Sequence, residues 1–313
     1  MKIFYGLNKF LRSPASSGKF AVTIGVFDGM HLGHRKILNT LVKRAKSKRI
    51  STLLITFSPH PALLTRPGKK VPLIMSLKHR LALAEETGVD CALVMHFTRK
   101  LSNMSAEEFA KKVLARTGAK EIVVGENFFF GKKKKGSPED LRRFARECGY
   151  LLNAEKTLKL RGLIVSSTNI RRLVSKGRLV EASRLLGRPF AVLGTVIRGT
   201  KRGRILGFPT ANIDPHHEAI PPSGVYAVKV RYRRKSYKGI VNIGFRPTFK
   251  KKLPYYEEPG IEVHIFGFNR NIYGENLEII FVKKIRNEKK FKNPALLRRQ
   301  IARDVGKVVK PVS

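Results

Sequence analysis

His31 and His34, with the glycines around them, are the residues best suited to chemistry in this sequence. They lie in Gly25-Val-Phe-Asp-Gly-Met-His-Leu-Gly-His34, between a strand-like run at 20–24 and a helix-like run at 35–47. A tight turn from a strand into a helix presents backbone N–H groups beside the positive helix end, which suits a phosphate. One helical turn brings both imidazoles to the same face. The pattern is typical of a loop that catalyses nucleotidyl transfer.

Two other interpretations of this segment remain open. It can be an ordinary strand-to-helix connection, or its two histidines can bind a metal ion. A metal site of this kind needs further N, O or S ligands. Asp28 is the nearest candidate, we expect it to order the turn, and no cysteine is close in the sequence. The ligand set is therefore incomplete.

Two loops that follow predicted strands carry further polar groups. Gly125-Glu-Asn-Phe-Phe-Phe-Gly131 leads into Lys132-Lys-Lys-Lys-Gly136. These lysines either stabilise the charge of a leaving pyrophosphate or lie in solvent. Thr56-Phe-Ser-Pro-His-Pro61 ends another strand, where His60 either lines a pocket or terminates the strand.

Hydroxyl groups gather in Val165-Ser-Ser-Thr-Asn-Ile-Arg171, where a helix is expected to begin. Ser166, Ser167 and Thr168 can cap that helix or bind a phosphate. Arg171 can make a forked contact to phosphate oxygens, which capping alone would not explain.

The first half of the chain alternates strand-like and helix-like runs. Ser105–Glu108 and Ser137–Asp140 match the capping-box spacing at two helix starts. Such alternation predicts a parallel sheet covered on both faces, with ligands at the carboxyl ends of the strands. We expect a Rossmann-like α/β nucleotidyltransferase domain over residues 1–186. Its strands are predicted at 21–26, 52–57, 91–96, 121–125 and 160–165, and its helices at 35–47, 77–87, 106–116 and 138–148.

The pattern changes near residues 186–189, beyond which short β-rich runs are separated by turn residues. Such runs predict a small antiparallel barrel over residues 187–313. Apolar residues at Leu297, Ile301 and Val305 have helical spacing, so a helix at 294–305 should end the domain. The predicted strands of the barrel are 191–197, 225–232, 238–243, 262–266 and 277–282.

Composition limits the class of protein. The 313 residues suffice for two domains, and a hydrophobic content of 42% supports packed cores. Cys91 and Cys148 are expected to be buried or incidental thiols rather than a disulfide framework. No apolar run approaches the ~20 residues of a membrane span, and the N-terminal residues lack the apolar core of a secretory signal. We expect a cytoplasmic protein.

The formal net charge is +42, from 64 Lys and Arg against 22 Asp and Glu. A nucleic-acid partner would explain such a charge. However, the basic residues are spread along the whole chain, and no zinc finger or RRM core is present. Nonspecific, salt-sensitive binding of nucleic acid is therefore the most that the charge predicts.

Taken together, the four segments of the first half resemble the N-terminal half of bacterial bifunctional riboflavin kinase/FAD synthetase. Four motifs of the second half resemble the kinase module of the same family, and the resemblance covers nearly the whole chain. It implies two activities, phosphorylation of riboflavin to FMN and adenylylation of FMN to FAD, each with ATP. The motifs are Gly203-Arg-Ile-Leu-Gly-Phe-Pro-Thr-Ala-Asn212, Gly224-Val-Tyr-Ala227, Asn242-Ile-Gly-Phe-Arg-Pro-Thr-Phe249 and Glu262-Val-His-Ile-Phe266.

The resemblance also implies how the kinase module binds its nucleotide. Thr210 and Asn212 would hold Mg²⁺ and its nucleotide through neutral oxygen donors. Gly207 and Asn242 are further binding positions, and the glycines of residues 199–207 permit a loop that wraps phosphates.

Glu262 would accept the proton of the riboflavin hydroxyl. Because Val263 and Ile265 are apolar, Glu262 should face the other side of its strand, together with His264. Without the motif, Glu262 would be read as an ordinary solvent-facing strand residue.

For the first domain, the resemblance implies direct attack of the FMN phosphate on the α-phosphorus of ATP, without a covalent enzyme intermediate. His31 and His34 would hydrogen-bond the phosphates as charge builds. The partners are then small molecules, with no membrane. The implied binding positions are Gly25, Phe27, Asp28, Gly33, Asn127, Ser166, Ser167, Thr168 and Arg171.

Two other hypotheses are compatible with parts of the sequence. In the first, the chain has a single activity and one module is kept only for packing. In the second, it is an RNA- or DNA-binding protein that uses its basic surface. Formation of FMN and FAD from riboflavin and ATP separates the hypotheses, because a nucleic-acid-binding protein would form neither product.

Overall fold

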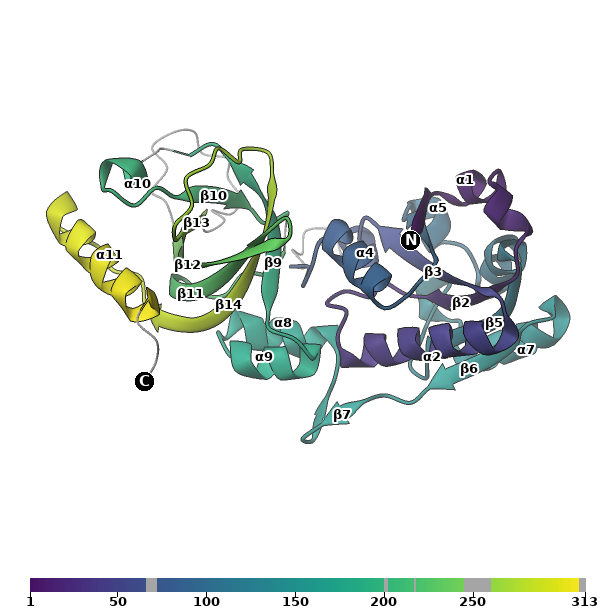
Figure 1. The fold of residues 1–313 in the computed structure, drawn as a ribbon. Coiled ribbons are helices and arrows are strands. Elements are labelled where there is room, and N and C mark those ends of the chain that lie inside the picture. The colour runs from purple at the N-terminus through teal and green to yellow at the C-terminus, as the bar shows by residue number, and fades with distance from the viewer. Residues whose placement is uncertain (66–71, 200–201, 217, 245–259, 310–313) are drawn as a thin grey trace. The chain divides into compact units, whose positions relative to one another are not determined.

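The computed structural model describes the chain except for residues 66–71, 200–201, 217, 245–259 and 310–313 (Figure 1). The chain forms two compact units. Unit 1 contains residues 1–72 and 77–167, and unit 2 contains residues 73–76 and 168–313.

Unit 1 is built on a six-stranded parallel sheet with the order β1-β4-β3-β2-β5-β6. Every residue of β2 is buried, as expected for a central strand covered on both faces. The chain runs from β2 to β3 and β4 on one side and returns to β5 and β6 on the other. The carboxyl ends of β2 and β5 therefore flank the switch point where ligands of such sheets bind. The strands are β1 (Lys2–Tyr5), β2 (Phe20–Ile24), β3 (Ser51–Ser58), β4 (Cys91–His96), β5 (Ala119–Gly125) and β6 (Leu151–Glu155).

The helices of unit 1 confirm both predicted capping boxes, Ser105 with Glu108 and Ser137 with Asp140. The predicted helix at 106–116 begins as expected but continues as a π-turn and a 3₁₀ turn. The helices are α1 (Leu7–Leu11), α2 (Leu32–Lys48), α3 (Pro61–Thr65), α4 (Leu77–Glu86), α5 (Arg99–Ser102), α6 (Ala106–Phe109) and α7 (Pro138–Cys148), with η1 (Pro14–Ser17), η2 (Ala110–Leu114), η3 (Ala115–Thr117) and η4 (Lys132–Lys134).

The predicted sheet strand at 160–165 is wrong. The chain forms a separate hairpin there, of β7 (Lys159–Leu160) and β8 (Leu163–Ile164). Arg161 and Gly162 both have positive φ, as a two-residue hairpin turn requires. Strands β1 and β6 were not predicted, and both lie at sheet edges, where a strand needs no long apolar run.

Unit 2 contains a closed, six-stranded antiparallel barrel with the order β10-β13-β12-β11-β14-β9, followed by the predicted C-terminal helix α11. The four-residue strand β10 was not predicted as a strand. The elements are α8 (Ser167–Ser175), α9 (Leu179–Leu186), β9 (Ala191–Ile197), α10 (Arg202–Ile205), β10 (Ala211–Asp214), β11 (Gly224–Tyr232), β12 (Lys235–Gly244), β13 (Gly260–Ile265), β14 (Asn276–Arg286) and α11 (Pro294–Val309).

Two buried carboxylates stabilise unit 2. Asp304 of α11 accepts a hydrogen bond from Arg286 Nε at 2.8 Å. Glu218 accepts the backbone N–H of Leu193 at 3.0 Å and also that of Ser76. Residues 73–76 therefore belong to the barrel unit although they lie between two helices of unit 1.

Both cysteines are free, as predicted. Cys91 is buried on β4, and burial, with the nearby charge of Asp90, raises the pKa of its thiol. Across the part of the chain that the structure describes, no helix combines the length and apolar character needed to cross a membrane.

Candidate active sites

The turn at residues 25–34 joins β2 to α2 and brings the two histidines together as predicted. His31 is the N-cap of α2, and its Nδ1 accepts the backbone N–H of His34 at 3.2 Å. The two rings stack with centroids 3.6 Å apart and an interplanar angle of 14°. Because Nδ1 of His31 is an acceptor, the proton of the neutral ring is on Nε2. The Nδ1 contact places the His31 ring at the positive N-terminus of α2.

Two glycines make room for the aromatic rings of the 25–34 turn. A Cβ at Gly25 would lie 3.0 Å from the ring of Phe27, and a Cβ at Gly33 would lie 3.3 Å from Cε1 and Nδ1 of His31. The Phe27 ring in turn lies 5.0 Å from that of His34. Gly25 and Gly33 thus act by allowing close packing of these rings.

Two residues of the turn that are not glycine have a positive φ, a backbone conformation that usually favours glycine. Phe27 has a φ of 54° and Met30 a φ of 39°, and both side chains are buried. Such residues cost about 1–3 kcal/mol each and persist only where the surroundings hold them. One holding contact is the Ser167 hydroxyl, which donates to the carbonyl oxygen of Asp28 at 2.7 Å.

Arg80 supplies a second holding contact, which was not foreseen from the sequence. Its guanidinium donates to the carbonyl oxygen of Val26 through Nη1 and to that of Phe57 through Nη2, the latter at 3.3 Å. One sequence signal could have revealed it. Arg80 falls three residues after Leu77 and four before Ala84, in the apolar stripe of the predicted helix.

The hydroxyl segment at 166–168 lies at the start of α8, as predicted. Of these residues, Ser167 bonds to the 25–34 turn, and Ser166 directly precedes the helix. Thr168 and Arg171 lie on α8 itself, in the part of the chain assigned to unit 2.

The loop after β5 leaves the sheet at the same edge as the 25–34 turn. Asn127 is exposed, and its Nδ2 donates to Thr157 Oγ1 at 2.7 Å. Glu126 accepts the Thr157 backbone N–H at 2.8 Å, a bond that lowers the pKa of Glu126. The lysines at 132–135 are exposed, on a loop closed by the pairing of Phe130 with Gly136.

His60 terminates its strand and caps the next helix. Its Nδ1 accepts the backbone N–H of Ala62, at the start of α3, with a distance of 3.0 Å. This contact agrees with one of the two roles that the sequence left open, a place at the end of the strand.

On the barrel, strand register brings three predicted site residues into one row. Glu262 of β13 lies directly opposite Asn212 of β10 and Asn242 of β12. Directly paired residues of antiparallel strands point to the same face. Val263 and Ile265 are buried while Glu262 is half-buried, so Glu262 faces away from the core, as predicted.

The loop before β10 packs closely around this row. A Cβ at Gly199 would collide with the side-chain amide of Asn212, and one at Gly203 would lie 2.9 Å from Thr210 Oγ1. His264, on the face of Glu262, lies with its Nδ1 2.8 Å from the carbonyl oxygen of Pro209. The stretch expected as a phosphate-wrapping loop contains the short helix α10, and its residues 200–201 lie outside the described residues.

Gly207 has a φ of +83°, a conformation that favours glycine at this turn. The motif that begins at Asn242 continues into residues 245–249, which also lie outside the described residues. Asn242 itself is exposed at the end of β12.

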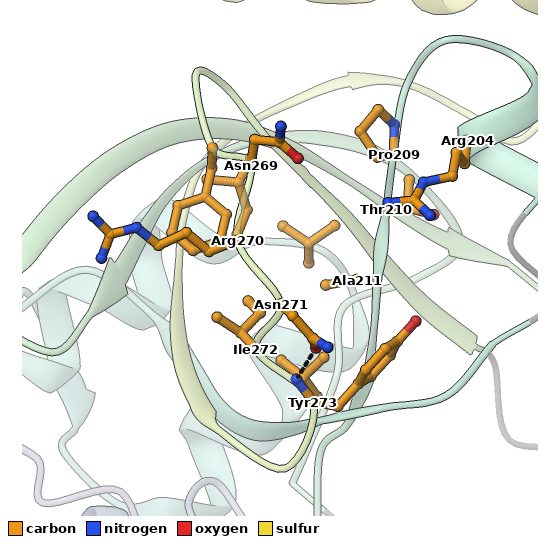
Figure 2. A pocket seen from close by; sticks show the side chains of 13 residues that line it. Arg204, Pro209, Thr210, Ala211, Asn269, Arg270, Asn271, Ile272 and Tyr273 are labelled. Atoms are coloured by element: carbon orange, nitrogen blue, oxygen red, sulfur yellow. Dashed lines mark hydrogen bonds between the residues drawn. The ribbon is translucent and has the colours of Figure 1, made fainter.

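A pocket of about 350 Å³ opens beside Thr210. Figure 2 shows Arg204, Pro209 and Thr210 on one side of it and the segment 269–273 on the other. Val263 and Ile265, from the face of β13 opposite to Glu262, also line it. The pocket thus combines an apolar floor with the positive charges of Arg204 and Arg270 at its rim, a combination suited to a flat ring carrying phosphates.

The oxygen donors on the barrel fit Mg²⁺ only as part of a larger ligand set. Among the described residues, no group of three or more His, Cys, Asp or Glu could hold a metal ion. Thr210 directly precedes β10 and Asn212 lies on it, and their side chains pack against Gly203 and Gly199 of the same preceding stretch. Two neutral oxygen donors fit a Mg²⁺ ion that keeps its waters and shares the phosphates of a nucleotide.

A parallel sheet with a histidine-containing turn at the end of β2, in one chain with a small closed barrel that carries a pocket, is the architecture expected of a two-domain nucleotide-dependent transferase. Known sequences agree with this class. Residues 13–169 match the family described as FAD synthetase, and residues 186–311 match the family described as riboflavin kinase.

Full-length relatives agree as well. The chain is 36% identical to the bifunctional riboflavin kinase/FMN adenylyltransferase of Buchnera aphidicola, over 97% of each chain. It is also 36% identical to the Bacillus subtilis protein of that name, over 91% of this chain and 90% of that one. A crystal structure of a protein from Streptococcus pneumoniae described as a macrolide-efflux protein matches 98% of this chain and 99% of that chain, with a TM-score of 0.82 and 28% identity. The chain belongs to the bifunctional riboflavin kinase/FMN adenylyltransferase family.

Proposed function

We propose that the two activities of the family are divided between the two units, with adenylyl transfer at the 25–34 turn and riboflavin phosphorylation on the barrel. As a member of its family, the chain converts riboflavin to FMN with one ATP, and FMN to FAD and pyrophosphate with a second. The stacked His31–His34 pair at the N-terminus of α2 is the observation that supports the assignment most directly.

In adenylyl transfer, an FMN phosphate oxygen forms a bond to the α-phosphorus of ATP while the bond to the bridging oxygen breaks. The attacking phosphate is already ionised, so no proton has to be removed by a base. What the site must supply is positive potential and N–H donors where charge gathers on the leaving pyrophosphate. His31, His34 and the N-terminus of α2 provide these groups, and Ser167 keeps the turn in shape.

In riboflavin phosphorylation, the 5′-hydroxyl forms a bond to the γ-phosphorus of ATP, and ADP leaves. Glu262 accepts the hydroxyl proton, and the pocket beside Thr210 holds the nucleotide base. Thr210 and Asn212 would hold Mg²⁺, which supplies charge neutralisation on the triphosphate when bound. Asn212 and Asn242 flank Glu262 in the same row and orient the groups around it.

We propose that residues 1–186 carry adenylyl transfer and residues 187–313 carry riboflavin phosphorylation. The riboflavin kinase match, which begins at residue 186, supports this boundary. Helices α8 and α9 come before this boundary in the sequence, but they fold as part of the barrel unit. The need for two ATP molecules per FAD supports a cytoplasmic location. Nucleic acid is proposed to bind at most nonspecifically, through the net charge of +42.

Product analysis with two variants tests the division. With riboflavin, Mg²⁺ and ATP, the protein should form FMN and then FAD by chromatography. His34→Ala should stop at FMN, and Glu262→Gln should form FAD only when FMN is supplied. The losses should be about 10²- to 10⁴-fold. Glu278→Gln, which alters a carboxylate paired with Arg231 on the same barrel, is the matched control and should keep both activities. If either site variant loses both activities equally while folded, the division is wrong.

A further inference from the structure

Arg80 is a charged residue buried in the core of unit 1. Its exposed fraction is 4%, and it shares the inner face of α4 with Leu81 and Ala84, which are also buried. Burying a guanidinium costs free energy unless its N–H groups are satisfied, so a buried arginine needs a structural or functional reason. Burial lowers the pKa of Arg80 to about 10, so the side chain is still a cation at neutral pH.

The contacts of Arg80 join the ends of two neighbouring strands. Val26 follows β2 by two residues, and Phe57 lies near the end of β3, which pairs with β2 in parallel. The Val26 carbonyl also accepts a hydrogen bond from Thr56 Oγ1 at 3.3 Å. Two donors on one oxygen determine the orientation of the peptide that opens the 25–34 turn.

That orientation has a direct consequence for the next residue. In a planar trans peptide, the C=O and the following N–H point in opposite directions. Because the Val26 carbonyl points to Arg80 and Thr56, the Phe27 N–H points away from them. Phe27 is also the first residue of the turn with positive φ. The geometry at Arg80 therefore sets the path by which the chain reaches His31.

Charge adds to this effect. Asp28, also buried, lies in the turn close enough to favour the charged form of Arg80. Arg80 thus balances the negative charge of Asp28 within a turn that is proposed to receive phosphates. Without it, the Asp28 carboxylate would repel the incoming triphosphate in a poorly solvated site.

We propose that Arg80 is a positioning residue for adenylyl transfer, which holds the Val26 carbonyl so that the 25–34 turn keeps its phosphate-binding shape and balances the charge of Asp28. This inference depends on the proposed role of the turn. Arg80 touches backbone and not the reacting atoms, so its loss should lower kcat for FAD formation while the kinase is unaffected.

Two substitutions distinguish the hydrogen bonds of Arg80 from its positive charge. Arg80→Lys keeps the positive charge, but a single amine cannot reach both carbonyls as the forked guanidinium does. Arg80→Met keeps much of the apolar volume and removes the charge. Lys78→Met, at an exposed position of the same helix, is the matched control. FAD formation from supplied FMN and FMN formation from riboflavin are measured on each preparation, with kcat and KM for ATP.

Arg80→Met should lower kcat for FAD formation about 10²-fold and raise KM for ATP, because a small displacement of reacting groups can cost that much. Arg80→Lys should lower kcat about 10-fold with a smaller change of KM, because the charge remains. Lys78→Met and the kinase activity of every variant should stay within about twofold of the parent. Circular dichroism and thermal unfolding confirm that each variant is folded.

The inference is overturned if Arg80→Lys retains the parent kcat for FAD formation, or if a folded Arg80→Met does so. Should Arg80→Met fail to fold, the Arg80→Lys result decides alone. His34→Ala, measured beside these variants, distinguishes the role of Arg80 from the role of the turn itself. If His34→Ala loses FAD formation while the Arg80 variants keep it, only the role of Arg80 is wrong. If His34→Ala keeps FAD formation, the assignment of the turn itself is wrong.

Discussion

Gly33→Ala should lower FAD formation while it leaves the stability of unit 1 nearly unchanged. Gly33 lies in the first turn of α2, where alanine is favoured over glycine by about 0.5–1 kcal/mol. The new Cβ would lie 3.3 Å from Cε1 and Nδ1 of His31 and 3.7 Å from the carbonyl oxygen of Val165. Only the His31 ring can yield, and it must move by a few tenths of an ångström.

The movement matters because His31 is held in place from two sides, by the backbone N–H of His34 and by the stacked ring. In the proposed role of the turn, a displaced imidazole would no longer meet the phosphates at hydrogen-bond distance. We expect kcat/KM for FAD formation to fall about tenfold, which corresponds to about 1.4 kcal/mol of transition-state stabilisation. The free energy of unfolding should change by less than about 1 kcal/mol, since the helix gain offsets the strain.

The assay supplies FMN and ATP and follows FAD by chromatography, with chemical unfolding measured on the same protein. Gly306→Ala in α11 is the matched control, because nothing lies within 4 Å of a Cβ there. It should raise the stability of unit 2 without any loss of FAD formation. Parent-level FAD formation by Gly33→Ala would refute the proposal that adenylyl transfer depends on the position of the His31 ring.

Two further predictions concern the barrel. Burial raises the pKa of Tyr226 to about 12, and its hydroxyl donates to the carbonyl oxygen of Pro222 at 2.5 Å. The folded state therefore keeps a proton that the unfolded state releases near pH 10, so stability is complete below pH 10 and is lost as the pH rises toward 12. Tyr226→Phe should remove that part of the alkaline loss in unfolding curves between pH 9 and pH 12, and an unchanged slope would contradict it. Asp304→Asn should lower the free energy of unfolding by about 3 kcal/mol, because it leaves the Arg286 charge without its partner. A denaturant midpoint equal to that of the parent would show that this pair does not anchor α11.

Local sequence patterns were sufficient to predict the elements whose structure depends on near neighbours. The two capping boxes, the turn that brings His31 to His34, and the strand β9 all agree with the structure. For the capping boxes and the His31–His34 contact, the deciding groups lie within a few residues of each other. The alternation of Glu262 with buried Val263 and Ile265 was equally visible, because side chains of a strand point to opposite faces in turn.

Contacts between distant segments could not be predicted in this way. The edge strands β1 and β6 exist because β4 and β5 offer them unpaired edges, and the run at 160–165 pairs with itself instead of with the sheet. The row of Asn212, Glu262 and Asn242 depends on the register of three strands. The buried carboxylate of Glu218, which binds residue 76 to the barrel unit, connects positions 142 apart.

The sequence by itself determined the family of this protein, since its motifs place imidazoles, hydroxyls and a carboxylate in the order typical of that family. Tertiary structure alone decided how those groups are held. Arg80 shows the difference most clearly: its residue type predicts a solvent-exposed cation, whereas the fold places its guanidinium between the carbonyl oxygens of Val26 and Phe57. The physical reason is that burial and pairing of a polar group depend on the partners that a distant segment supplies, and local spacing carries no information about those partners.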